Sequence, residues 1–358
     1  MALDKKKVVV GISGGVDSTV AAILLKEQGF NVIGITIKMF EYAMVGRDYR
    51  ETACCSINSI NEGRVALEKM GIPTYVIDIK EIFKEKIMDY FVKEYLNGRT
   101  PNPCVMCNYY IKWAVLLKYA DALNAFYVAT GHYARIEHEN ERYFIKKGID
   151  QKKDQSYMLW ILTQEMLART LFPLGNLKKE DVRRIAAERG LTRLATKPES
   201  YEICFVKEGD YRKFLESYAG IKPLNGIIVD KENNVLGTHK GYWNFTIGQR
   251  RGLGIPAHKP FYVIDIIPEE NKVVVGEKHD LLKKRVIASN FNLQKYPQIG
   301  EPLNVTAKIR YLTEGIPGFA FIENGYLVFE CEGMEGVTPG QSLVVYEDED
   351  IVGGGIIL

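Results

Sequence analysis

Residues 13–18 (SGGVDS) have the composition of an anion-binding loop. They follow an apolar run at 7–12 and precede a stretch with helical spacing of apolar residues at 19–28. The two glycines let backbone N–H groups close on an anion, and the N-terminus of the following helix adds its positive dipole. The segment lacks the Gly-Lys-Ser/Thr of a P-loop and the GxGxxG of a dinucleotide fold. The sequence therefore predicts another kind of phosphate site, in which Asp17 offers a carboxylate to a hard cation.

Cysteines supply the second candidate chemistry. The chain has six in 358 residues, which is too few for a disulfide scaffold. Cys54-Cys55 and the Cys104-x-x-Cys107 pair suit reduced, reactive or metal-binding thiols in a reducing compartment. Residues 1–7 form a short polar lead with three lysines and no secretory signal, so we expect a cytoplasmic protein.

Alternating strands and helices must position the loop. The predicted elements, strand and helix in turn, lie at 7–12, 19–28, 31–37, 57–70 and 73–79, with further helices to about residue 96, a helix at 116–124 and a strand at 125–130. This alternation is typical of a parallel sheet. We therefore expect a doubly wound α/β unit over the first 130 residues, with ligands at the carboxyl ends of its strands.

The pattern changes along the rest of the chain. Between 150 and 198 it is helical, and an amphipathic helix at 178–190 is closed by Gly190. From residue 225 onward, short β-rich runs alternate with Gly, Pro, Asn and Asp turns, at 226–229, 261–267, 272–275, 305–310, 327–330 and 342–346. These runs predict small β domains, one of them a barrel.

Composition excludes some classes of protein and leaves others open. Hydrophobic residues make up 46% and charged residues 26%, which is ordinary for a soluble globular protein, and no stretch has the length of a membrane span. We therefore expect no membrane partner. The net charge of +2 does not by itself indicate a nucleic-acid partner, because strongly basic domains carry that signal.

Short motifs spread over nearly the whole chain resemble one known family. They lie at 11–18, 98–108, 129–133, 153–157, 203–205, 246–254, 310–311, 338–341 and 353–355. The SGGxDS form resembles the PP-loop ATP pyrophosphatases, which split ATP to AMP and pyrophosphate by adenylating a substrate oxygen. All the motifs together look like the tRNA-specific 2-thiouridylases of the MnmA (TrmU) type.

The resemblance implies a reaction and a domain order. The reaction is ATP-dependent 2-thiolation of uridine at wobble position 34 of tRNA, by adenylation of the uracil 2-oxygen and sulfur transfer from a cysteine persulfide. It implies a PP-loop (adenine nucleotide alpha hydrolase-like) domain at 1–208 that includes a helical tRNA-contacting segment, a small central β-rich domain at 209–279 and a C-terminal β-barrel at 280–358. ATP and Mg²⁺ are the implied cofactors. The implied partners are the tRNA anticodon stem-loop and a persulfide donor, either a cysteine desulfurase or a sulfur carrier.

Binding residues are also implied by the resemblance. For ATP they are Gly11, Ile12, Ser13, Gly14, Gly15, Val16, Asp17, Ser18, Ile37 and Gly131. The target-base region comprises Asn102, Pro103 and Cys104, and the implied tRNA contacts are His132, Lys153, Asp154, Gln155, Arg310, Tyr311 and Gln341. Ile37 stands where the family often has methionine, a change that a backbone contact to adenine tolerates.

Two thiols carry the chemistry in this scheme. Cys204 accepts the persulfide and attacks C2 of the activated uridine, while Cys107 releases the sulfur and passes through a Cys107–Cys204 disulfide. Cys104 departs from the aspartate common at its position. Three thiolates, Cys104, Cys107 and Cys204, are also the ligands that a [4Fe-4S] cluster with one open iron requires, and this mechanism remains the alternative to the persulfide relay. Cys54-Cys55 and Cys331 are interpreted as structural residues.

Two other functions compete with this prediction. A PP-loop synthetase that amidates or ligates a small carboxylate would share the loop but has no use for a matched pair of thiols. A non-catalytic RNA-binding protein could use Cys104-x-x-Cys107 as half of a zinc site, but no second CxxC or Cys/His pair stands at zinc-ribbon spacing. For isolated residues such as Cys107, Cys204 or His132, a purely structural role is the simpler alternative.

Overall fold

The computed structural model describes residues 2–41, 57–197, 203–206, 209–256 and 259–358, with backbone alone at 57–62. Cys54 and Cys55 lie outside these residues. The chain divides into two compact units. Unit 1 contains Met1–Ile87, Cys104–Gly209 and Glu349–Ile351, and unit 2 contains Met88–Pro103, Asp210–Asp348 and Val352–Leu358.

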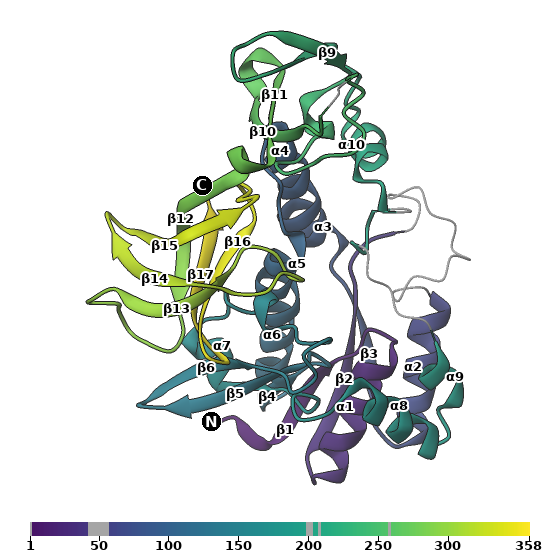
Figure 1. The fold of residues 1–358 in the computed structure, drawn as a ribbon. Coiled ribbons are helices and arrows are strands. Elements are labelled where there is room, and N and C mark those ends of the chain that lie inside the picture. Colours follow the sequence, from purple (N-terminus) through teal and green to yellow (C-terminus); the bar gives the residue numbers. More distant parts are fainter. Residues whose placement is uncertain (1, 42–56, 198–202, 207–208, 257–258) are drawn as a thin grey trace. The chain divides into compact units, whose positions relative to one another are not determined.

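A five-stranded parallel sheet is the centre of unit 1 (Figure 1). Its strands are β1 Asp4–Gly11, β2 Asn31–Lys38, β3 Thr74–Asp78, β4 Ala125–Ala129 and β7 Thr170–Leu171. The order β3-β2-β1-β4-β7 places β1 in the middle, where Val8, Val9 and Val10 are fully buried. A strand covered on both faces reads as a continuous apolar run, which is why the sequence predicts it well.

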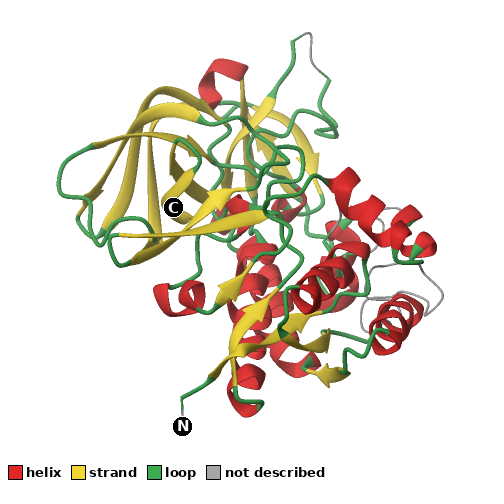
Figure 2. Ribbon diagram, turned by 90° about the horizontal axis from the view of Figure 1, so that it is seen from below, coloured by secondary structure: helices red, strands yellow, loops and turns green. Residues whose placement is uncertain are grey.

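Helices pack around this sheet, as the red ribbons of Figure 2 show. They include α1 Val16–Glu27, α2 Ile57–Lys69, α6 Ala114–Ala122, α7 Gln164–Ala168, α8 Lys179–Glu188, α9 Thr192–Thr196 and the 3₁₀ turn η4 Ser156–Met158. Helix α1 is buried on two sides. Ala22, Ile23 and Leu25 pack in the core of the sheet, while Val20 and Ala21 pack in a second cluster with residues of α8.

Two π-helical segments interrupt the helices that lead to the site. The first stretch is α3 Lys80–Phe83, η2 Lys84–Asp89 and α4 Tyr90–Leu96, and the second is α5 Pro103–Met106 and η3 Cys107–Trp113, followed by α6. A π-helix bonds each N–H to the carbonyl five residues earlier, and such segments are frequent at functional sites. Residues five apart, such as Cys107 and Lys112, therefore lie on the same side of η3.

Unit 1 also contains a hairpin that the sequence analysis missed. Strands β5 Ala134–Glu139 and β6 Arg142–Lys147 pair antiparallel around a two-residue turn. Asn140 and Glu141 both have positive φ, of 48° and 62°, as the turn type that matches the twist of a hairpin requires.

Unit 2 contains a closed antiparallel barrel and a smaller sheet. The barrel order is β12-β15-β14-β13-β16-β17, and pairing of β12 with β17 closes it. Its strands are β12 Leu282–Leu293, β13 Leu303–Lys308, β14 Ile316–Glu323, β15 Tyr326–Glu335, β16 Ser342–Glu347 and β17 Asp350–Ile357. The smaller sheet, in the order β10-β11-β8-β9, comprises β8 Gly226–Val229, β9 Val235–His239, β10 Tyr262–Ile267 and β11 Lys272–Gly276.

Helices α4 and α10 Tyr211–Ala219 pack together within unit 2. Tyr95 stacks on Tyr211 with ring centroids 4.5 Å apart, and Phe91 meets Phe214 edge-on at 5.9 Å. Short 3₁₀ turns connect the other elements, at η6 Tyr242–Asn244, η7 Pro268–Glu270 and η8 Lys278–Leu281.

The predicted architecture is confirmed: a parallel α/β sheet, a β-rich middle part and a C-terminal β-barrel. The predicted strands at 31–37 and 226–229 correspond to β2 and β8, within one residue at their ends. In the described part of the chain, no helix combines the length and apolar character needed to cross a membrane.

Candidate active site

The strand order creates a crevice at the carboxyl end of the parallel sheet. The connection after β1 leads through α1 to β2 on one side, whereas β4 lies on the other side of β1. The loops that follow β1 and β4 therefore diverge, and such a switch point is the usual ligand site of an open α/β sheet. The loop after β1 contains 13–18, and the loop after β4 begins at Thr130.

The loop at 13–18 has the backbone geometry that an anion site needs. Gly14 has φ +82°, a conformation that a side chain would strain. Gly15 is the N-cap of α1, and no side chain caps the helix there, so N–H donors of its first turn are available to a ligand. Ser18 Oγ lies 3.1 Å from Ser13 Oγ and accepts from Ser13 N at 3.1 Å, which fixes the turn.

Gly131 allows the second loop to approach the first. A Cβ at this position would lie 2.7 Å from Ser18 N and 2.8 Å from the carbonyl carbon of Asp17. Only glycine permits this contact between backbones, and it sets the width of the crevice.

Asp17 is held by two side chains from elsewhere in unit 1. Lys179 Nζ donates to both Asp17 oxygens at 2.7 Å, and Tyr133 Oη donates to Asp17 Oδ1 at 2.8 Å. The Lys179 side chain is only 9% exposed and begins α8, whose packing against α1 brings it to the loop. A carboxylate offers about four acceptor positions, so these three bonds leave capacity for a metal ion.

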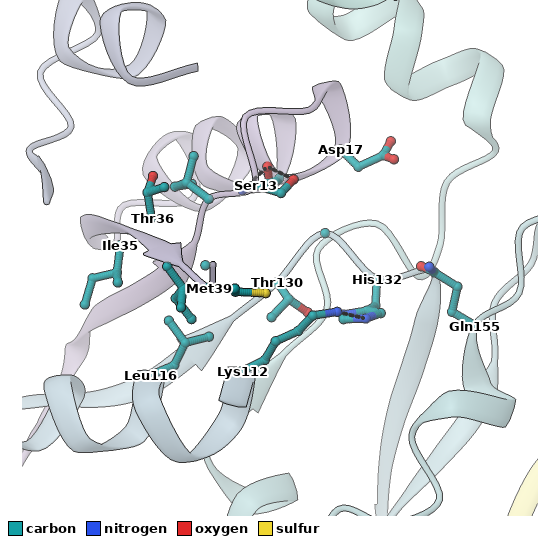
Figure 3. A pocket seen from close by; sticks show the side chains of 15 residues that line it. Ser13, Asp17, Ile35, Thr36, Met39, Lys112, Leu116, Thr130, His132 and Gln155 are labelled. Carbon is teal, nitrogen blue, oxygen red and sulfur yellow. Dashed lines mark hydrogen bonds between the residues drawn. The ribbon is translucent and has the colours of Figure 1, made fainter. Parts of the chain in front are cut away.

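A cavity of about 220 Å³ lies between the two loops (Figure 3). It is lined by Gly11, Ile12, Ser13, Asp17, Ser18, Ile35, Thr36, Ile37, Met39, Lys112, Leu116, Thr130, Gly131, His132 and Gln155. Apolar side chains and a few polar groups share the lining, as is usual for a cofactor site. The buried hydroxyl of Thr36 has no hydrogen-bond partner, which is costly unless a ligand or water supplies one. These features fit a nucleotide.

Lys112 joins the thiol-bearing helix to this cavity. It lies on η3, which begins at Cys107, and its Nζ lies 3.4 Å from His132 Nε2. His132 is 8% exposed, and its Nδ1 lies 2.7 Å from Thr130 Oγ1. Burial and the neighbouring Lys112 charge hold the pKa of His132 well below its ordinary value, so the ring is neutral.

The thiols at 104 and 107 are reduced and in the same electrostatic environment. Burial raises the pKa of Cys107 to about 11, while the Lys112 charge opposes the rise and the Cys104 thiol adds to it. Cys107 is buried, whereas Cys104 is exposed at its surface. Desolvation by the surrounding protein nevertheless raises the pKa of Cys104, again against Lys112. Lys112 is therefore the cation that favours the thiolate at both positions.

Cys204 is partly buried and reduced, and its neighbour Phe205 anchors the segment. The Phe205 ring packs edge-on against Phe83, with centroids 5.8 Å apart, and Phe83 also packs against Phe40 at 5.7 Å. Phe83 ends α3, which contacts η3. The segment that carries Cys204 therefore packs, through Phe205, on α3, and α3 in turn contacts η3, where Cys107 lies.

The three thiols do not form the ligand set that a cluster requires. In the described residues, which include Cys104, Cys107 and Cys204, no group of three His, Cys, Asp or Glu side chains is placed to hold a metal ion. An iron–sulfur cluster needs its thiolates around one small volume. The structure therefore does not support the [4Fe-4S] alternative.

Comparison with known proteins extends over the whole chain. Residues 6–208 match the family described as tRNA methyl transferase HUP domain, 212–277 the tRNA methyl transferase PRC-barrel domain, and 283–357 the aminomethyltransferase beta-barrel domain. The tRNA-specific 2-thiouridylase MnmA of Salinibacter ruber is 46% identical, over 99% of this chain and 94% of its own. The one from Clostridioides difficile is also 46% identical, over 98% of each. This chain belongs to the MnmA 2-thiouridylase family.

Among solved structures, NMN synthetase from Francisella tularensis aligns at 16% identity and a TM-score of 0.36, over 60% of this chain and 78% of that one. The MnmA assignment does not depend on so weak a likeness.

In unit 1 of this MnmA-family chain, some of the residues expected to contact tRNA line the cavity, and others bond to their own turn. His132 and Gln155 line the cavity beside the loop at 13–18. Asp154 organises its own turn, because its carboxylate accepts from Gly148 N at 3.0 Å and from Ser156 N at 3.1 Å. Lys153 N donates to Asp150 O at 2.9 Å in the same turn.

In unit 2, the side chains of two residues expected to contact tRNA donate hydrogen bonds to backbone carbonyls. Arg310 Nη2 donates to Gly336 O at 3.1 Å and to Ile247 O at 3.3 Å. Gln341 Nε2 donates to Thr100 O at 2.9 Å and to Pro101 O at 3.3 Å. Gln341 thereby fixes the approach to Asn102 and Pro103, the segment that enters α5 and Cys104. Tyr311 follows Arg310 in the same loop.

Sequence reasoning missed several residues of the site. Tyr133 and Thr130 lie inside the motif at 129–133, so their positions, though not their roles, were marked, whereas Lys112 lies four residues beyond the motif at 98–108. No sequence pattern near Lys179 indicates that it pairs with Asp17, because the two residues are 162 positions apart. Only the packing of α8 on α1 reveals that pair.

Proposed function

We propose that this MnmA-family chain is an ATP-dependent tRNA-uridine 2-sulfurtransferase that thiolates uridine at wobble position 34. One observation carries the proposal: η3 begins at Cys107 and, five residues later, presents Lys112 to the cavity lined by the loop at 13–18. The Cys107 thiol and one cation of the cavity lining are thereby carried by the same helical segment. A synthetase for a small carboxylate has no need of that arrangement.

Adenylation is the first proposed step. The loop at 13–18 and the start of α1 would bind the phosphates of ATP, with Ile37 and Gly131 beside the adenosine. Asp17 would hold Mg²⁺, which supplies charge neutralisation for the departing pyrophosphate. Lys179 and Tyr133 orient the Asp17 carboxylate for that purpose.

Sulfur transfer is the second proposed step. The terminal sulfur of a Cys204 persulfide attacks C2 of the adenylated uracil, and AMP leaves with the electron pair of the C2–O bond. The Cys107 thiolate then attacks Cys204 Sγ and breaks the S–S bond, which leaves sulfur on C2 and forms a Cys107–Cys204 disulfide. Two electrons from an external thiol reductant restore both thiols. A persulfide donor protein supplies the sulfur in this scheme.

RNA recognition completes the proposal. Asn102, Pro103 and Cys104 would border the target base, which must leave its stack to be reached. Of the remaining expected contacts, Lys153, Arg310 and Tyr311 would bind the anticodon stem-loop. We also retain the division into domains at 1–208, 209–279 and 280–358, and a cytoplasmic location, as part of the proposal.

The deciding experiment is reconstitution of the reaction. The protein is incubated with ATP, Mg²⁺, a persulfide source and unmodified tRNA, and the digested nucleosides are analysed by mass. We expect 2-thiouridine at position 34 together with AMP and pyrophosphate. A tRNA with cytidine at position 34 is the matched control. Absence of both 2-thiouridine and tRNA-dependent pyrophosphate from the uridine substrate would refute the proposal.

A further inference from the structure

Lys112 stands out among the side chains around the cavity. Within the described part of the chain, it is the only lysine or arginine in the lining, and it has no carboxylate partner. Lys179, the other cation near the loop, is committed to Asp17. Figure 3 shows the Lys112 side chain extending from its helix to His132. An unpaired cation in a partly buried site favours an anionic ligand.

His132 is built to receive a hydrogen bond from Lys112. An ammonium group only donates, so the nitrogen that faces it, Nε2, must be the acceptor. The proton of the neutral ring is then on Nδ1, which donates to Thr130 Oγ1. Trp113 and Phe172 pack against the ring, with centroids at 5.6 and 6.2 Å, and fix its plane.

The direction of this hydrogen bond defines what His132 can do. Its ring carries no positive charge and is buried, so it is poorly suited to attract an RNA phosphate. A buried neutral acceptor instead orients the ammonium that donates to it. One such bond leaves two N–H donors of Lys112 for a ligand.

We propose that Lys112 binds the α-phosphate oxygens of ATP during adenylation and that His132 is its positioning residue. This inference rests on the proposed function and assigns roles within the same site. The uracil 2-oxygen bonds to the α-phosphorus as the bond to the bridging oxygen of pyrophosphate breaks. Pyrophosphate leaves with the electron pair, and the N3 proton of uracil passes to water. Lys112 stabilises the charge on the non-bridging α-oxygens and transfers no proton.

The Lys112 test measures pyrophosphate release in the first turnover with tRNA and ATP, without a sulfur source. We expect Lys112→Met to slow release by about 10²- to 10³-fold, and Lys112→Arg, which keeps the charge, by no more than about 10-fold. Lys118→Met is the matched control, because Lys118 is exposed on the following helix and outside the cavity. Its rate is expected to equal that of the wild type.

A second measurement keeps the test decisive if Lys112→Met does not fold. Substitution of one non-bridging α-oxygen of ATP by sulfur weakens the contact with an ammonium, so the wild type should discriminate between the two α-thio diastereomers of ATP. Lys112→Arg should change that discrimination ratio. Wild-type rates in Lys112→Met, or an unchanged ratio in Lys112→Arg, would overturn the role of Lys112. Failure of the wild type itself to release pyrophosphate would instead remove the proposed function.

The His132 test separates positioning from RNA contact. His132→Leu removes the acceptor and should lower kcat by about 10-fold or more at unchanged KM for tRNA, because one oriented electrostatic contact is lost. His132→Gln supplies an oxygen acceptor near the position of Nε2 and should restore most of kcat. A raised KM for tRNA with unchanged kcat in His132→Leu would contradict the positioning role and favour an RNA contact.

Discussion

Unit 1 and unit 2 use their motif residues in different ways. In unit 1, the motif residues Ser13, Asp17 and His132 line a cavity. In unit 2, the polar groups of Arg310 and Gln341 are bonded to backbone carbonyls. A family motif therefore locates an important side chain without telling whether it contacts the substrate or holds the chain that does. The two units should respond to substitution in correspondingly different ways.

Loss of a thiol in unit 1 should have the largest effect. Cys107→Ser is expected to lower 2-thiouridine formation by more than about 10³-fold, because a serine hydroxyl cannot open the persulfide, while pyrophosphate release persists. Mass analysis of digested tRNA measures the first quantity. Cys331→Ser, in β15 of unit 2, is the control and should stay within about 3-fold of the wild type. Equal loss in both variants would contradict a special role for Cys107.

Lys179→Met should have the next largest effect. It leaves the Asp17 carboxylate without its two 2.7 Å bonds, and we expect pyrophosphate release to fall by about 10²-fold. Lys178→Met, one residue earlier and exposed, is the matched control. Retention of the wild-type rate by Lys179→Met would show that the ion pair is structural only.

The Cys107 thiol should show a raised pKa in its reaction with iodoacetamide. Burial moves its pKa from an ordinary 9.0 to about 11, so the thiolate is scarce at pH 8 and alkylation should be about 100-fold slower than for an ordinary thiol. The rate should rise about tenfold per pH unit up to that pKa. Peptide mass spectrometry follows the extent of alkylation at Cys107. An alkylation rate that levels off near pH 8 would contradict a pKa raised by burial. In Lys112→Met, which lacks the cation that favours the thiolate, the rate should level off at a higher pH than in the wild type.

Arg310→Ala, in unit 2, should act through stability. Loss of the bonds to Gly336 O and Ile247 O is expected to reduce the free energy of unfolding by about 1–2 kcal/mol, measured from the urea midpoint. Arg310→Lys keeps the charge but not the planar fork. Lowered stability in Arg310→Lys would confirm that the guanidinium holds the backbone. If that variant also keeps full tRNA affinity, the contact of Arg310 with RNA depends on its charge alone. Arg250→Ala, at an exposed position, is the control.

Gln341→Ala should have the smallest effect. Two neutral hydrogen bonds to Thr100 O and Pro101 O are lost, which costs about 1 kcal/mol and should raise KM for tRNA a few-fold by loosening the approach to Asn102. Gln298→Ala removes an exposed glutamine of the same unit and should change neither quantity. Faster hydrogen exchange at 100–104 in Gln341→Ala would sharpen the assignment, and unchanged exchange there would contradict it.

The fold was predictable where the apolar pattern of the sequence matches the burial of the strand or helix that it forms. The centre of the parallel sheet is covered on both faces, so β2 and the second half of β1 appear in the sequence as apolar runs, whereas the edge strand β3 is largely exposed. The β5–β6 hairpin was missed, because its exposed face breaks the apolar pattern and its turn uses Asn140-Glu141 in place of a glycine pair. No local pattern indicates η3, since a π-helix differs from an α-helix by one extra residue in its hydrogen-bonded ring.

The site was predictable where it is contiguous. The loop at 13–18 is a local motif and lines the cavity as expected. The pairing of Lys179 with Asp17 depends on how α8 packs against α1, which no sequence window contains. The contact of Lys112 with His132 depends on the same kind of long-range packing, because η3 and the loop after β4 meet only in the folded unit.

The winding of η3 has a consequence for how this segment tolerates length change. Positions five apart differ by about 140° around an ordinary α-helix, but they lie on the same side of a π-helix, whose hydrogen bonds join residues five apart. Removal of one residue between 107 and 112 would leave Cys107 and Lys112 four apart, about 40° around a regular α-helix, so both would stay on one side. The segment should therefore tolerate loss of its extra residue better than rewinding as an α-helix at its present length, which would turn Lys112 away from Cys107.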